Sequence, residues 1–168
     1  MVLRFQTQVE EWSSTQAALA SSNDRRASVP PGIRGHTPPP ISPGTVLVHF
    51  DGATKTSIGG GVGFVGFSGP TTILFAFGKF YDYMIDAFII EMLALRDALG
   101  WCLSNSISNV SFCADAHVII QMINRKDSSH VLGGSLLAEI QVLRVSMQRV
   151  SFHFALRKYN RAAHIVAK

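Results

Sequence analysis

The stretch "VLVHFDGA", residues 46–53, predicts a buried strand that ends in an acid. Apolar side chains alternate onto both of its faces, which is typical of a strand that is covered on both sides. Such a strand is a poor place for an ionised carboxylate, yet Asp51 follows the apolar run directly. Gly52 and Ala53 come next and add no bulk, so we expect another backbone or a phosphate to approach closely here.

The composition predicts one folded domain. The chain has 168 residues, 47% of them hydrophobic, which is enough for a real core. Its net charge of +4 and sequence pI of about 9.4 permit a polyanionic partner without proving one. No run is apolar enough to span a bilayer or to act as a signal peptide.

The only two cysteines, Cys102 and Cys113, lie in apolar surroundings and form no disulfide framework. A reduced, intracellular protein, nuclear or cytoplasmic, is therefore the simpler expectation. Arginines among serines near the N-terminus leave organelle targeting open, although acids in the same region weaken that indication.

Composition changes near residue 44. The preceding stretch "SSNDRRASVPPGIRGHTPPPISPG" is rich in Pro, Ser and Gly, and Pro70 is the only proline after it. We predict a flexible or polyproline-like arm over residues 1–44, with a short helix over 3–20, and a folded domain over 45–168.

Within the domain, the hydrophobic pattern predicts the order β-β-β-α-β-α-α-β-α. Strands are expected at 46–51, 59–67, 72–80, 109–115 and 150–156, and helices at 85–106, 116–124, 133–149 and 160–168. Asn160 is expected to cap the last helix. A meander followed by αβ crossovers implies a mixed five-stranded sheet flanked by helices, an α/β fold of mixed α+β character.

Three acids occupy positions where acids are awkward. Asp51 and Asp115 each end a predicted strand, and Glu91 borders the apolar stripe of the long helix. If the two strands are neighbours, these carboxylates converge without a basic partner and repel one another. A divalent cation relieves that repulsion, and oxygen ligands suit Mg²⁺.

Each acid also has an ordinary structural interpretation. Asp115 can serve as a helix N-cap, Glu91 as a solvated rim residue, and Asp51 with Gly52 as punctuation between a strand and a turn. The joint pattern is more specific than any one of these positions.

Four separated segments carry a family resemblance. In chain order they are "FDGA", the Glu of "IIEMLALRDAL", the Asp of "FCADAHVII" and the closing "LRKYNRAAHIVAK". Together they resemble the type-1 ribonuclease H domain, in particular its plant reverse-transcriptase-like version of retroelement origin. The resemblance covers residues 45–168.

The resemblance implies a ribonuclease H fold and an endonuclease that cuts the RNA strand of an RNA–DNA hybrid. In that family four carboxylates bind two Mg²⁺ ions, which activate a water and stabilise the departing 3′ oxygen. By motif, three of these carboxylates fall on Asp51, Glu91 and Asp115. The fourth falls on His164, four residues after Asn160, where the familiar pattern has Asp.

An imidazole at His164 brings no negative charge and suits Mn²⁺ better than Mg²⁺. His164 is either a metal ligand of this kind or a partly buried helix histidine. The histidine-bearing loop found before the last helix in bacterial members is missing, and Arg157 lies near that place. We expect Arg157 either to contact phosphate, together with Gly52, Ala53 and Asn160, or to be merely solvated.

Three functions remain open. The leading hypothesis is a metal-dependent ribonuclease acting on RNA–DNA hybrids, favoured by the three acids. The second is a catalytically weak or inactive module that binds a hybrid or RNA, favoured by His164 and by the weak basicity. The third is a scaffold domain with a protein partner. Binding should be modest and non-specific, through phosphates and 2′-hydroxyls, and we expect a monomer without membrane contact.

Overall fold

The protein is described by a computed structural model that covers residues 38–55, 57–125 and 133–168. The helix predicted over residues 3–20 lies outside the described residues, as does most of the predicted arm. Residue Ile41, near the end of that arm, packs against the domain. No helix in the described ranges is long and apolar enough to cross a membrane.

The predicted order of elements is confirmed. The strands are β1 (Val46–Lys55), β2 (Gly59–Phe67), β3 (Ile73–Asp82), β4 (Asn109–Ala114) and β5 (Arg149–Phe154). The helices are α2 (Ala87–Ser104), α3 (His117–Arg125), α4 (Gly134–Val145), the 3₁₀ turn η2 (Arg157–Tyr159) and α5 (Arg161–Ala167). The strands form one mixed sheet in the order β3-β2-β1-β4-β5, with β1, β2 and β3 antiparallel and β1, β4 and β5 parallel.

The prediction that β1 ends at Asp51 is wrong. The strand runs on to Lys55, because its antiparallel pairing with β2 continues to the pair Lys55 and Gly59. Its parallel pairing with β4 stops earlier, at the pair His49 and Cys113. Asp51 therefore lies inside β1 but beyond the end of the β1–β4 ladder.

Three helices, α2, α4 and α5, are shorter than predicted. α2 begins at Ala87 rather than Ile85, because the side chain of Asp86 caps it by accepting the Ile89 N–H at 2.9 Å. α4 ends at Val145, so Met147, which falls inside the helix predicted over 133–149, lies beyond the helix while remaining buried.

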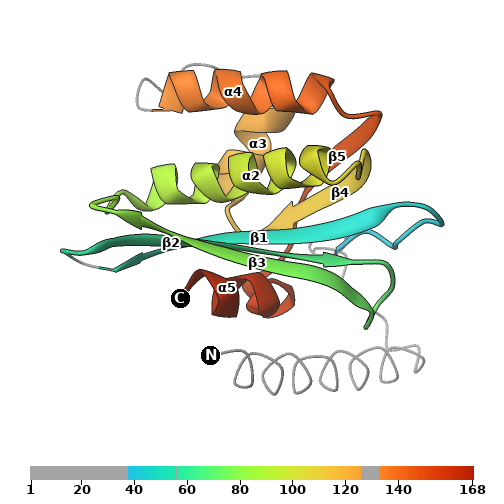
Figure 1. Cartoon of the computed structure of the whole chain (residues 1–168), viewed down its shortest axis with the longest axis horizontal. Helices are drawn as coiled ribbons and strands as arrows, with labels where there is room; N and C mark the ends of the chain where they lie inside the picture. Colours follow the sequence, from blue (N-terminus) through green and yellow to red (C-terminus); the bar gives the residue numbers. More distant parts are fainter. Residues whose placement is uncertain (1–37, 56, 126–132) are drawn as a thin grey trace, which may run out of the picture.

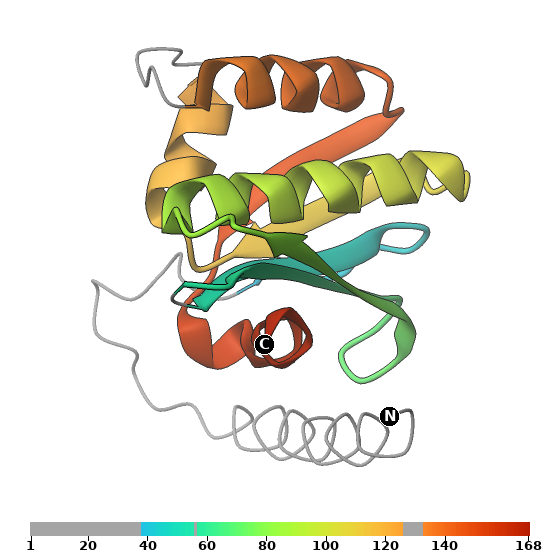
Figure 2. The same ribbon diagram turned by 60° about the vertical axis from the view of Figure 1, so that its left-hand side comes forward.

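The two faces of the sheet are covered unequally (Figure 1). Helices α2, α3 and α4 lie on one face, where residues such as Val48, Phe50, Phe64 and Leu95 form the main core. Of the α-helices among the described residues, only α5 lies on the opposite face, as the turned view also shows (Figure 2). There it helps to form a smaller cluster of buried residues, namely Leu47, Val65, Phe67, Cys113, Ala155 and Ala162.

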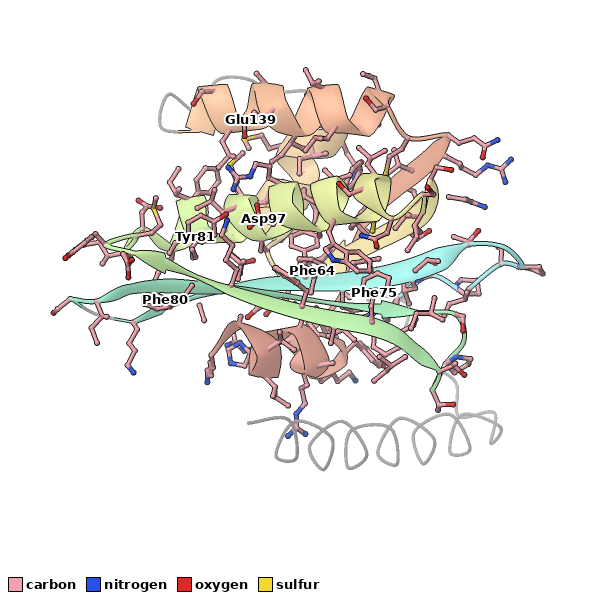
Figure 3. The ribbon with its side chains drawn as sticks, in the orientation of Figure 1. Phe64, Phe75, Phe80, Tyr81, Asp97 and Glu139 are labelled. Atoms are coloured by element: carbon pink, nitrogen blue, oxygen red, sulfur yellow. The ribbon has the colours of Figure 1, made fainter. Side chains whose placement is uncertain are left out.

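Hydrogen bonds between polar side chains connect β3 to α2. The Tyr81 hydroxyl donates to Asp97 Oδ2 at 2.6 Å, and Arg96 donates to Asp97 Oδ1 at 2.7 Å. Figure 3 shows Tyr81 and Asp97 facing each other, with Phe64 and Phe75 further along the same side of the sheet. Because the charged groups here pair with one another, this cluster stabilises the helix–sheet contact.

α5 packs closely against β2 at Gly61 and Gly63, where β2 has no side chains toward the helix. A Cβ added at Gly61 would collide with the backbone of Ala167, and one at Gly63 would lie 2.6 Å from the carbonyl oxygen of Ala163. The glycines of β2 therefore let the seven-residue helix α5 pack next to the part of the sheet that contains Asp51, which pairs with Gly63.

Candidate metal centre

Asp51, Glu91 and Asp115 converge as the sequence predicts. One carboxylate oxygen from each lies within 4.8 Å of the other two. The three side chains come from β1, from α2 and from the residue after β4, so only the folded chain brings them together. Oxygen donors at this spacing match the ligand set that Mg²⁺ and similar hard cations accept.

The register of the sheet places the two aspartates. Since the β1–β4 ladder ends at His49 and Cys113, Asp51 follows two residues later within β1, and Asp115 follows two residues later, directly after the end of β4. Side chains two residues apart on a strand share a face. Both carboxylates therefore lie on the α5 side, just past the end of the ladder.

Gly52 brings Glu91 to the same point. Its N–H donates to Glu91 Oε2 at 3.0 Å, and a Cβ at position 52 would lie 2.6 Å from the Glu91 nitrogen. The close backbone that the sequence led us to expect is thus that of α2. Ala53, also expected at the site, is half-buried and pairs with Gly61 in the ladder.

The site is short of positive charge. Burial, and then the charge of Asp115, raise the pKa of Asp51 to about 8. Burial, followed by the charges of Asp51 and Asp115, raises the pKa of Glu91 to about 9. Neither carboxyl group is fully ionised at neutral pH unless a cation joins the cluster.

Asn160 occupies the N-cap position of α5, but the prediction that its side chain caps the helix is wrong. Its amide instead donates to the Phe50 carbonyl oxygen and to Asp115 Oδ1, both at 2.9 Å, and to Asp51 Oδ1 at 3.5 Å. Carbonyl and carboxylate acceptors compete successfully for the amide protons because the side chain is fully buried among them.

His164 contacts the acid cluster directly. Its Nδ1 lies 2.7 Å from Asp51 Oδ2, and its Nε2 lies 3.0 Å from a guanidinium nitrogen of Arg157. One neutral tautomer satisfies both contacts, with Nδ1–H donating and Nε2 accepting. Burial, and then Arg157, lower the pKa of His164, which favours this neutral form. The cluster of closely spaced ligand atoms among the described residues does not include His164.

Arg157 stands at the open side of the cluster. Its side chain is 66% exposed, and Nη1 lies 3.5 Å from Asp115 Oδ2. The guanidinium therefore partly offsets the charge of the acids, and it remains accessible to an anion.

His49 was not predicted as a site residue from the sequence. It is 4% exposed and lies two residues before Asp51 on the same face of β1, next to the side chain of Asn160. The available signal was a polar residue at a buried strand position two residues ahead of the acid.

Comparisons with known proteins agree with this site and fold. The family model described as reverse transcriptase-like matches residues 49–168. The chain belongs to this family. Its domain is a ribonuclease H-like domain of the reverse transcriptase-like type. A comparison with curated proteins found no match.

The reverse transcriptase-like domain has the fold of solved ribonucleases H. It is similar to ribonuclease H1 of Halobacterium salinarum, with 19% identity, a TM-score of 0.67, and coverage of 73% of this chain and 94% of that one. It is also similar to the N-terminal ribonuclease H domain of a Mycobacterium tuberculosis protein, with 17% identity, a TM-score of 0.66, and coverage of 73% of this chain and 90% of that one. A third similar structure is LC11 ribonuclease H1, solved in complex with an RNA/DNA hybrid. It has 15% identity, a TM-score of 0.65, and coverage of 73% of this chain and 93% of that one.

Proposed function

We propose that this protein is a metal-dependent endonuclease that hydrolyses the RNA strand of RNA–DNA hybrids. The observation that carries the proposal is the convergence of three carboxylates from three elements within 4.8 Å. Two of them have pKa values raised to about 8 and about 9, so the cluster calls for a cation. The ribonuclease H-like fold supports the choice of reaction.

The residues present fit divalent cations. Asp51, Glu91 and Asp115 offer hard oxygen donors, and we propose that they hold two Mg²⁺ ions, with His164 as a fourth ligand that shifts the preference toward Mn²⁺. When bound, such cations supply an activated water and positive charge at the departing 3′ oxygen.

The other residues of the site hold and orient groups. Asn160 keeps one oxygen of Asp51 and one of Asp115 turned toward its amide. His164 restrains the second oxygen of Asp51. We propose that Arg157, with its exposed guanidinium, binds a phosphate next to the cleaved bond, and that the backbone at Gly52 and Ala53, together with Asn160, lines the path of the RNA strand.

The charge distribution supports a polyanionic substrate. Residues 140–168 contain no Asp or Glu but six Lys or Arg, and this segment includes η2 and α5 beside the acids. Phosphate contacts made by these cations are independent of sequence and weaken with salt. We therefore propose a hybrid or RNA as the partner. The buried free thiols of Cys102 and Cys113 suit an intracellular location, nuclear or cytoplasmic.

A second candidate function is a module that binds hybrids without efficient cleavage. The observation that favours it is His164, which stands where the resemblance implies a fourth carboxylate and is hydrogen-bonded to Asp51. An imidazole there leaves the ligand set one negative charge short, and this weakens the more loosely held of two cations.

The test is cleavage of a 5′-labelled RNA annealed to DNA, in Mg²⁺, in Mn²⁺ and in EDTA, with single-stranded RNA and double-stranded DNA as substrate controls. We expect internal cuts in the RNA that require the metal. Asp115→Asn should abolish them, whereas Glu139→Gln removes an exposed carboxylate on α4 and should not. Absence of cleavage in either metal would contradict the proposal, and retained hybrid binding would then support the second function.

A further inference from the structure

His49 and Asn160 form a buried polar pair behind the carboxylates. His49 is 4% exposed and Asn160 is fully buried. The His49 ring meets the Phe67 ring edge-on, with 5.5 Å between the centroids and an interplanar angle of 79°. The pair therefore lies between β1, β2 and the start of α5, away from solvent.

The amide of Asn160 sorts the oxygens of two acids. Its NH₂ group donates hydrogen bonds to Oδ1 of Asp51 and to Oδ1 of Asp115. The Oδ2 atoms point elsewhere, that of Asp51 to His164 and that of Asp115 to Arg157. One amide thus fixes which oxygen of each carboxylate faces the protein and which faces the open side of the site.

This sorting depends on the orientation of the amide. An Asn side chain turned by 180° exchanges its oxygen and its NH₂ group, and its oxygen would then face the Phe50 carbonyl and two carboxylates. In the observed orientation Asn160 Oδ1 is buried and has no partner at strict hydrogen-bond geometry among the described residues. A buried carbonyl oxygen without a donor costs free energy.

The His49 ring is the group placed to serve that oxygen. Its side chain lies next to that of Asn160 on the α5 side of the sheet, and an imidazole N–H is a suitable donor for an amide oxygen. A neutral imidazole carries one N–H and adds no charge that would repel a cation.

We propose that His49 is a positioning residue, whose N–H directed at Asn160 Oδ1 holds the amide in the orientation that aligns Asp51 and Asp115 for a cation. The inference rests on the proposed function only in that the carboxylates bind a metal. Groups of this kind, one step removed from the ligands, commonly change metal affinity by about 10–100-fold.

Two variants separate positioning from packing. His49→Phe keeps an aromatic ring against Phe67 but removes the N–H, whereas His49→Gln keeps an N–H donor with a different shape. In the full chain, we expect His49→Phe to weaken Mn²⁺ binding, measured by electron paramagnetic resonance, by about tenfold. His49→Gln should stay within about threefold of the parent, and both variants should melt cooperatively.

A metal-free readout keeps this test independent of the nuclease activity. In ¹⁵N spectra without metal, the Asn160 side-chain NH₂ should exchange with solvent slowly in the parent and in His49→Gln, and faster in His49→Phe. If Asn160 and Mn²⁺ binding behave alike in the parent and in His49→Phe, His49 only packs and the inference is wrong. It is also wrong if His49→Gln loses as much as His49→Phe. Failure of the proposed function alone would appear as absent cleavage by the parent with the Asn160 pattern intact.

Discussion

The two faces of the sheet differ in what their side chains do. On the face covered by α2, α3 and α4, the strands contribute large apolar residues such as Val48 and Phe50 to the main core. On the face covered by α5, the same strand contributes His49 and Asp51. Alternation along one strand therefore supplies both a core and a polar site.

This contrast shows which side of the sheet accommodates buried polar and charged groups. The buried polar or charged residues of the described chain are His49, Asp51 and Asn160, and all of them lie on the α5 side. A short helix over glycines leaves room there for groups that would disrupt the main core. We infer that the α2 side provides most of the stability, whereas the α5 side holds most of the polar site, to which α2 adds Glu91. Substitutions on each side test this division.

The largest effect should come from Asp51→Asn on the α5 side. The substitution keeps the shape of the side chain but removes a metal-binding charge, so cleavage of a hybrid should fall by about 10³-fold or more. Thermal stability should hold or rise, because repulsion among the acids is relieved. Cleavage rates and melting curves measured on the same preparations test the predicted loss of activity and the predicted thermal stability. A variant that cuts like the parent would show that Asp51 is not in the active site.

On the α2 side, Leu95→Ala should do the reverse. Leu95 is fully buried in the main core, and its truncation leaves a cavity that costs about 3 kcal/mol in the free energy of unfolding. Urea unfolding measures this loss. Activity per folded molecule, measured at a temperature well below the melting point, should stay within about twofold of the parent. If activity fell with stability unchanged, the division between the two faces would be wrong.

Next in size is the pH dependence of the metal-free protein. The folded-state pKa values of Asp51 and Glu91, about 8 and about 9, lie above the ordinary values of these groups. The folded form therefore holds protons that the unfolded form releases, and the stability falls as pH rises from about 4 toward 9. Between pH 6 and pH 9 we expect the melting temperature to drop by roughly 5–10 °C.

Two additions sharpen that result. Glu91→Gln should flatten the pH profile, and saturating Mg²⁺ should flatten it in the parent, whereas Glu139→Gln on exposed α4 should leave the slope unchanged. Equal slopes in the parent and both variants without metal would show that the acid cluster does not control the pH dependence of the stability.

The smallest effect concerns His164. Restoring a carboxylate with His164→Asp adds the missing negative charge, so Mg²⁺-dependent cleavage should rise by about threefold to tenfold, and the preference for Mn²⁺ should decline. Titration of both metals against the parent, His164→Asp and His164→Ala on one hybrid gives the answer. Indistinguishable behaviour of all three in Mg²⁺ would make His164 a packing residue.

Local patterns in the sequence were sufficient to predict the sheet and the acids. Asp51 and Asp115 follow apolar runs whose order makes them neighbours, and helical spacing placed Glu91 beside the core stripe. The extent of β1 was not predictable, because it depends on how far β2 continues to pair. The hydrogen bonds of Asn160 were not predicted because their acceptors, such as the Phe50 carbonyl oxygen, lie far away in the chain. The role of His49 was not predicted for the same reason, since its neighbour is Asn160.

The most direct test of the central claim, that the three carboxylates form a cation site, is calorimetric titration of Mn²⁺ into the full chain. At pH 7.5, in two buffers of different ionisation enthalpy, the parent should bind Mn²⁺ saturably and release protons, since the pKa values of Asp51 and Glu91 lie above that pH. Asp51→Asn should bind at least about tenfold more weakly and release fewer protons. Binding that is absent in the parent, or equal in the parent and the variant, would contradict the account.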